Sequence, residues 1–224
     1  AADRDAPVPR HELVVELADR VCFVQQRLPA GAARPVTPER IDAIVAANDR
    51  LAGVLRGLAA ELPPMCRPQR PDPVLRAAAG RVPDGARTVD RLYRLAGETP
   101  AGMRAGQDLM HTDLSAANVL LDDHGRATGI VDWNLGAFRG DRDFALITMR
   151  FDRQWFVRRP DAPPSERASA DRLDRVVTDR IAPEALRVYW AQWCLHQLRR
   201  TLKRGADDLD WQLAFAADRL ESAR

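Results

Sequence analysis

The stretch VLLDDHGRATGIVDW, residues 119 to 133, follows directly on HTDLSAAN, residues 111 to 118, and together they decide the fold. Two short apolar arms, residues 119 to 121 and 128 to 131, flank the turn-forming residues 122 to 125. This pattern is typical of a short antiparallel β-hairpin. The sequence therefore predicts a loop that leads into a hairpin.

The two ends of this hairpin carry oxygen ligands. Folding the arms back places Asn118, which precedes the first arm, beside Asp132, which follows the second. Mg²⁺ is usually held by one or two such protein groups, while phosphates and water complete its shell. Asp113 lies on the same loop, before Asn118. A carboxylate close to two metal ligands suits phosphoryl transfer, in which one group orients the attacking hydroxyl.

The spacing HxDxxxxN over residues 111 to 118, followed by Asp-Trp at 132 and 133, resembles the catalytic core of the aminoglycoside phosphotransferase and choline kinase-like family. This family is related to the protein kinases, whose signature is HRDxxxxN followed by DFG. The resemblance implies a catalytic base at Asp113 and metal ligands at Asn118 and Asp132. It implies a structural role in the loop for His111.

The resemblance extends to GDRDFAL, residues 140 to 146, which is similar to the family's GDPxxDLA segment. The second aspartate of that segment falls on Ala145, so its contribution is expected from Asp143 or is absent. Upstream, PVPR at residues 7 to 10 resembles the stretch that follows the helix of the amino-terminal lobe in the family, and QRLPAG at residues 26 to 31 resembles the hinge. The hinge backbone binds adenine in the family, which implies nucleotide contacts at Gln26 and Leu28. The alternative is an edge strand that runs into a Pro-Gly turn.

The scarcity of lysine is relevant to nucleotide binding. Lys203 is the only lysine among 34 lysine and arginine residues. Kinases of this superfamily hold the ATP phosphates with a lysine on an amino-terminal strand. Lys203 lies far beyond the hairpin in a predicted helix, and no Gly-rich loop precedes Gln26. We therefore expect the chain to begin after the nucleotide-binding loop, as a fragment of a longer protein or as a natural truncation.

The composition is that of an ordinary globular protein, with 46% hydrophobic residues among 224. No apolar run approaches the roughly 20 residues that span a bilayer, and no signal-peptide core stands at the amino terminus. We therefore expect a cytoplasmic protein without a membrane partner. The net charge of +2 predicts no nucleic-acid partner. The three scattered cysteines are expected to be reduced and mostly buried.

The remaining elements follow from local patterns. Residues 13 to 17 and 21 to 26 predict a hairpin, a helix begins at Thr37-Pro38, and five prolines make residues 62 to 73 a loop. Helices are expected over residues 89 to 96, from Pro183, and after a break at Gly205. Residues 149 to 164 carry four arginines and are expected to form a loop or broken helix on the acceptor side, or else a solvated basic surface loop.

Three aspartates near the carboxy terminus are candidate substrate ligands: Asp207, Asp208 and Asp210. Aminoglycoside-modifying relatives bind their cationic acceptors with acidic residues of the last helices, so the resemblance implies the same role here. The alternative is that these residues form the cap and first turn of the last helix, where carboxylates suit the helix dipole.

The expected fold class is α/β (α+β) and protein-kinase-like: residues 1–31 form the remnant of an amino-terminal β-lobe with its hinge, and residues 32–224 a mainly helical carboxy-terminal lobe. The expected function is transfer of the γ-phosphate of ATP (or GTP), with Mg²⁺, to a hydroxyl of a small molecule of antibiotic or amino-sugar type. One alternative is a catalytically silent pseudokinase that binds a ligand or partner. Hydrolysis by a metal-bound water is disfavoured, because no further cluster with metal-ligand spacing is present. The sequence leaves the oligomeric state open.

Overall fold

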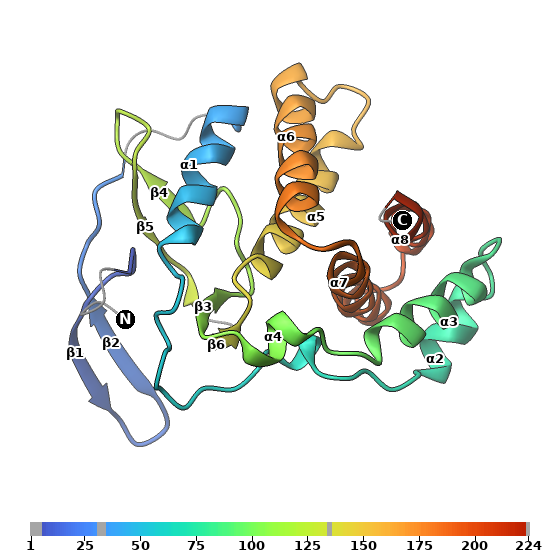
Figure 1. The fold of residues 1–224 in the computed structure, drawn as a ribbon, viewed down its shortest axis with the longest axis horizontal. Helices are drawn as coiled ribbons and strands as arrows, with labels where there is room; N and C mark the ends of the chain where they lie inside the picture. The colour runs from blue at the N-terminus through green and yellow to red at the C-terminus, as the bar shows by residue number, and fades with distance from the viewer. Residues whose placement is uncertain (1–5, 31–34, 134–135, 223–224) are drawn as a thin grey trace. The chain divides into compact units, whose positions relative to one another are not determined.

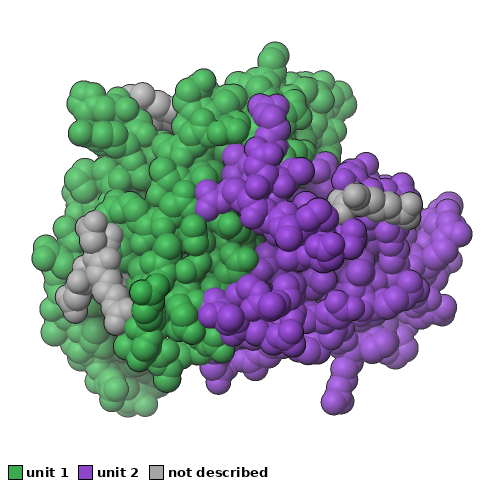
Figure 2. Space-filling view, viewed as in Figure 1, with its two compact units in different colours: residues 1–60, 107–174 green, residues 61–106, 175–224 purple. Residues whose placement is uncertain are grey.

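Figure 1 shows the computed structural model, which describes residues 6–30, 35–133 and 136–222. The chain divides into two compact units, each built from two separate stretches (Figure 2). The first unit comprises residues 1–60 and 107–174, and the second comprises residues 61–106 and 175–224. The expected lobe boundary between residues 31 and 32 lies outside the described residues and stays a prediction. No helix in the described ranges is long and apolar enough to cross a membrane.

The first unit contains small antiparallel sheets of two strands each. They pair β1 (His11–Glu16) with β2 (Val21–Gln25), β3 (Asp108–His111) with β6 (Ala137–Gly140), and β4 (Val119–Leu121) with β5 (Ala127–Ile130). Its helices are α1 (Pro38–Asp49), α5 (Phe144–Val157) and most of α6 (Pro164–Arg180). Both hairpins expected from the sequence are confirmed, whereas β3 and β6 were not anticipated.

The helix α1 begins as its sequence predicts. Thr37 has extended backbone angles, and its hydroxyl accepts a hydrogen bond from the Arg40 N–H at 3.3 Å, while Pro38 occupies the first turn. This arrangement satisfies one of the N–H groups that a helix start leaves without an intrahelical partner. Ile41 and Ile44 are fully buried, and α1 lies against β5. The helix therefore supports the hairpin β4–β5 (Figure 1).

The second unit is helical. It contains a 3₁₀ turn (Pro64–Cys66), α2 (Pro73–Ala79), α3 (Gly85–Ala96), α4 (Ala101–Ala105), the end of α6, α7 (Pro183–Lys203) and α8 (Leu209–Ser222). Tyr189 and Trp190 lie on the predicted apolar stripe of α7 and are buried, and α3 and α8 both pack on α7. The break before α8 falls at Gly205, whose φ of 112° is in the region that favours glycine. The expected order of helices is confirmed.

Candidate phosphotransfer site

The hairpin β4–β5 brings two candidate metal ligands to neighbouring positions. Val119 faces Ile130 in the ladder, and the Val131 N–H donates to the Asn118 carbonyl at 2.8 Å, which extends the pairing by one step. Asp132 follows immediately with a φ of 64°, so the chain turns away from the strand at this residue. Asn118 and Asp132 therefore flank the open end of the hairpin, as the sequence pattern indicates.

The loop between β3 and β4 is closed by the side chain of Asn118. Its Nδ2 donates to the Asp113 carbonyl at 2.9 Å, and its backbone N–H donates to Ser115 at 3.2 Å. Because the amide nitrogen is committed to this bond, the orientation of the amide is fixed and its oxygen is directed elsewhere. Asp113 is half-buried on the same loop. The backbone of the candidate base is therefore tied to the candidate metal ligand.

The side chain of His111 connects the loop to the hairpin. Its Nε2 lies 3.0 Å from the Val131 carbonyl, and its Nδ1 lies 3.3 Å from the Asp113 N–H. A backbone N–H can only donate and a carbonyl can only accept, so the imidazole is neutral with its proton on Nε2. Burial lowers the pKa of His111, while the Val131 carbonyl and the carboxylates of Asp113 and Asp132 oppose this shift. The structural role implied for His111 therefore has a geometric basis in its two backbone contacts.

Trp133 completes this support. Its ring meets the His111 ring edge to face, with centroids 4.4 Å apart, and its Nε1 donates to the Ile130 carbonyl at 2.9 Å. Edge-to-face contacts between rings are favourable because the positive edge of one ring meets the negative face of the other. The aromatic residue next to Asp132 therefore holds the turn against the loop.

The donor set at the hairpin end suits Mg²⁺ rather than a transition metal. Asn118 offers an amide oxygen and Asp132 a carboxylate, the hard oxygen ligands that Mg²⁺ prefers. Among the described residues, no cluster of three or more His, Cys, Asp or Glu side chains can hold a metal. A site with two protein ligands that leaves the other positions to phosphate and water is the arrangement expected for Mg²⁺.

Two residues beside the loop could not be identified from the sequence. Arg40 of α1 donates from Nη2 to the Ala116 carbonyl at 2.7 Å, which ties the loop to the helix. Asp152 of α5 is 38% exposed, and burial raises its pKa; the charge and hydrogen bond of Arg153 lower it, and the negative charge of Asp113 adds a smaller upward shift. Asp152 therefore adds a second carboxylate in the neighbourhood of Asp113.

The segment GDRD at residues 140 to 143 is fixed by its arginine. Arg142 donates from Nη1 to Asp108 at 2.8 Å and from Nη2 to Asp49 at 3.3 Å. Burial opposes the charge of Arg142, but the carboxylates around it raise its pKa above the ordinary value. Asp143 directly precedes α5, and the contribution that the resemblance implies for it stays a prediction.

The segment predicted to be the hinge contacts β5 through Leu28 and Pro29. The Thr128 hydroxyl donates to the Pro29 carbonyl at 2.6 Å, and Gly129 approaches Leu28 so closely that an added β-carbon would overlap Leu28 Cδ1. The Gln26 N–H donates to the Arg10 carbonyl at 2.8 Å, so an adenine contact by Gln26 has to use its carbonyl. The contact with Leu28 also explains why a glycine is present in the middle of a strand.

Gly129→Ala is expected to destabilise the protein by about 1 kcal/mol, the lower end of the usual cost of overpacking, because the added methyl group must displace the free end of the half-buried Leu28 side chain. Leu28→Ala removes the overlapping atom, so the same change at Gly129 should cost clearly less in that background. Urea unfolding of the wild type, both single variants and the double variant gives the coupling free energy between the two positions. An equal cost of Gly129→Ala in both backgrounds would show that Leu28 does not pack against β5.

The three carboxy-terminal aspartates belong to the second unit. Asp208 directly precedes α8 and its carboxylate accepts a hydrogen bond from the Trp211 Nε1 at 2.7 Å. Asp210 lies in the first turn of α8, and Asp207 is exposed. These positions agree with the cap and first turn of a helix. A role of these residues in acceptor binding stays a prediction.

Comparison with known proteins places these features in a family. Residues 1–138 match the sequence model of the Phosphotransferase enzyme family. No curated protein matches the chain.

Solved structures of aminoglycoside phosphotransferases share the fold. One is a thermostable mutant of the aminoglycoside phosphotransferase APH(4)-Ia in a ternary complex with ADP and hygromycin B, at 20% identity and a TM-score of 0.62 over 96% of this chain and 77% of that one. Another is a putative aminoglycoside phosphotransferase from Ralstonia eutropha, at 12% identity and a TM-score of 0.52 over 99% and 77% of the two chains. The predicted protein-kinase-like fold, with small amino-terminal sheets and a mainly helical remainder, is confirmed.

Proposed function

Since the chain belongs to the phosphotransferase enzyme family, we propose that it transfers the γ-phosphate of ATP or GTP to a hydroxyl group of a small molecule. One observation carries the proposal: the Asn118 side chain is hydrogen-bonded to the backbone of Asp113, and the Asn118 carbonyl is hydrogen-bonded to Val131, the residue before Asp132. A base beside two oxygen ligands is the arrangement that phosphoryl transfer requires.

In the proposed reaction Asp113 accepts the proton of the acceptor hydroxyl as that oxygen forms a bond to the γ-phosphorus, while the bond from the γ-phosphorus to the β–γ bridging oxygen breaks and the nucleoside diphosphate leaves. Asn118 and Asp132 would hold Mg²⁺, which would neutralise charge on the phosphates. The neutral His111 holds the loop in place, because its Nδ1 accepts a hydrogen bond from the Asp113 N–H. Protonation of Nδ1 would break this bond. The carbonyl of Gln26 and the backbone of Leu28 are the proposed adenine contacts.

We propose an acceptor that carries amino groups, as aminoglycoside antibiotics and amino sugars do. The pKa of Asp152 is raised by burial and, to a smaller extent, by the negative charge of Asp113, while Arg153 lowers it. Asp152 accepts a hydrogen bond from Arg153 but stays partly accessible to solvent, as does Asp113, and an ammonium group would be attracted by both negative charges. The relative bound to hygromycin B supports the same acceptor class.

The test is phosphate transfer from ATP and GTP to a panel of hydroxyl compounds with and without amino groups, followed by mass spectrometry of the products. It uses the chain of 224 residues and any longer product of its gene. We expect Mg²⁺-dependent phosphorylation of amino-bearing acceptors. Calorimetry with ATP and Mg²⁺ completes the test: a protein that neither binds the nucleotide nor phosphorylates any acceptor would refute the proposal and favour the pseudokinase alternative.

A further inference from the structure

The loop between β3 and β4 is held by bonds within its own neighbourhood and by a bond from a distant helix. The local bonds join Asp113 to His111 and to Asn118. The distant bond comes from Arg40 of α1, whose Nη2 donates to the Ala116 carbonyl at 2.7 Å. Ala116 lies between Asp113 and Asn118 in the chain, so this bond acts on the segment that joins the candidate base to a candidate metal ligand.

Burial gives the bond between Arg40 and Ala116 its weight. Ala116 is only 5% exposed, and a buried carbonyl that loses its donor is strongly unfavourable. Arg40 is half-buried, and a hydrogen bond from a charged donor is stronger than one between neutral groups. Without the guanidinium, the carbonyl has to move towards water or be reached by it, and either change loosens the loop.

Arg40 is itself held at a defined place in the first unit. It lies in the first turn of α1, where its N–H donates to the hydroxyl of Thr37 at 3.3 Å, and α1 lies against β5. Burial lowers the pKa of Arg40, as does the charge of Arg153, while the carboxylate of Glu166 opposes this shift. Since an arginine in a protein stays protonated, Arg40 is a permanent donor at a fixed position beside the loop.

We propose that Arg40 is a positioning residue, which holds the loop in the conformation that Asp113 and Asn118 need for phosphate transfer. Its effect on turnover rests on the proposed function, because a displacement of the reacting groups by about 1 Å can cost on the order of 10²-fold in rate. Its effect on the loop does not rest on that function. The two effects can therefore be tested separately.

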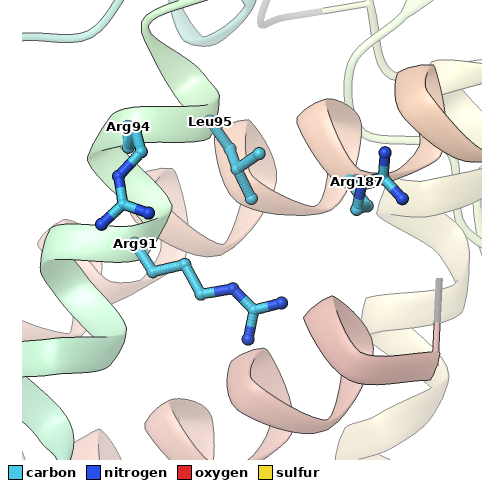
Figure 3. Close-up of a pocket in the computed structure, with 4 residues that line it drawn as sticks. All are labelled: Arg91, Arg94, Leu95 and Arg187. Carbon is cyan, nitrogen blue, oxygen red and sulfur yellow. The ribbon is translucent and has the colours of Figure 1, made fainter. Parts of the chain in front are cut away.

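Arg91 offers a matched control in the second unit. Figure 3 shows Arg91 among residues that line a pocket there, and its Nη2 donates to the Leu220 carbonyl of α8 at 2.9 Å. Like Arg40, it is a half-buried arginine of a helix that donates to a main-chain carbonyl far away in the sequence. Arg40→Met and Arg91→Met therefore remove the same charge and the same kind of bond, but the loop belongs to the first unit and Arg91 to the second.

The first test is hydrogen exchange of the backbone amides of residues 112 to 118 in the full chain. It compares the wild type with Arg40→Met, Arg40→Lys and Arg91→Met, and thermal unfolding verifies that each protein is folded. We expect exchange to be about tenfold faster in Arg40→Met and unchanged in Arg91→Met. Arg40→Lys should show a smaller increase, because its ammonium group keeps the charge and can still donate.

This exchange test needs neither a nucleotide nor an acceptor. The proposal is overturned if the loop exchanges alike in the wild type and Arg40→Met, or if Arg91→Met accelerates it equally. If Arg40→Met does not fold, Arg40→Lys decides the matter, and exchange of the loop at the wild-type rate in this shorter side chain together with wild-type turnover would overturn the proposal.

The second test is steady-state phosphate transfer by the same proteins, with the acceptor that the panel identifies. We expect Arg40→Met to lower turnover by about tenfold or more and to leave the KM for the acceptor within about twofold, because the loop acts on the geometry of the transition state. Arg40→Lys should recover part of the turnover, and Arg91→Met should match the wild type. A loss confined to KM, or the same loss in Arg91→Met, would contradict the proposal. If the wild type transfers no phosphate, the proposed function fails, while the exchange test still decides whether Arg40 holds the loop.

Discussion

Asp113→Asn is expected to lower the turnover number for phosphate transfer by about 10²–10⁴-fold, the usual contribution of a positioned general base. Asparagine keeps the size of the side chain but cannot take the proton of the acceptor hydroxyl. The contacts that hold the loop use the backbone of Asp113: its N–H donates to His111 and its carbonyl accepts from Asn118. The substitution should therefore leave the fold and the nucleotide affinity nearly unchanged.

The matched control is Asp123→Asn, which makes the same chemical change at an exposed position in the turn of the same hairpin. Turnover, nucleotide binding and thermal unfolding are measured for both variants and the wild type. The control should resemble the wild type in all three measurements. Turnover by Asp113→Asn close to that of the wild type would refute the role of this residue as the base, and a parallel loss of thermal stability would indicate a structural role instead.

The part of the site built from local sequence could be predicted. The hairpin follows from two apolar arms and a turn within about a dozen residues of chain, and its closure brings Asn118 and Asp132 together without any other information. The loop spacing puts Asp113 on the same loop as Asn118, whose side chain is hydrogen-bonded to the Asp113 carbonyl. The local pattern also predicts the start of a helix at Thr37, because a hydroxyl residue followed by a proline is typical of the first turn of a helix.

The part built from distant segments could not be predicted. The strands β3 and β6 have four residues each and pair across the whole hairpin, so neither has a repeating pattern long enough to identify. Arg40 and Asp152 approach the loop from helices far away in the sequence. Their positions depend on how those helices pack. In the sequence, a charged residue on the surface cannot be told apart from a charged residue at a functional site.

The arginines of residues 149 to 164 show the same difficulty. The chain forms the helix α5 up to Val157 and resumes in α6 at Pro164, so the expected broken helix is confirmed. The alternative of a solvated basic surface is wrong for Arg150 and Arg153, which are only 4% exposed. Each forms an ion pair with an acidic residue of α6, Asp174 and Glu166 respectively. The pairing partner decides whether an arginine can be buried, and the sequence does not identify that partner.

Arg153→Met is expected to destabilise the first unit by about 3–5 kcal/mol, the usual cost of removing one partner of a buried ion pair. Arg153 donates to Glu166 at 2.8 Å and to Asp152 at 3.1 Å, and the side chain of Glu166 is only 15% exposed. Methionine fills a similar volume, so the main loss is the countercharge of a buried carboxylate. Urea unfolding measures the change in the free energy of unfolding.

Two further variants separate this charge effect from packing. Arg159→Met removes an ion pair with Asp161 whose side chains are 61% and 71% exposed, and it should cost less than about 1 kcal/mol. Adding Glu166→Gln to Arg153→Met removes the uncompensated charge and should restore part of the stability. If Arg153→Met cost no more than Arg159→Met, Glu166 would have to reach water in the variant.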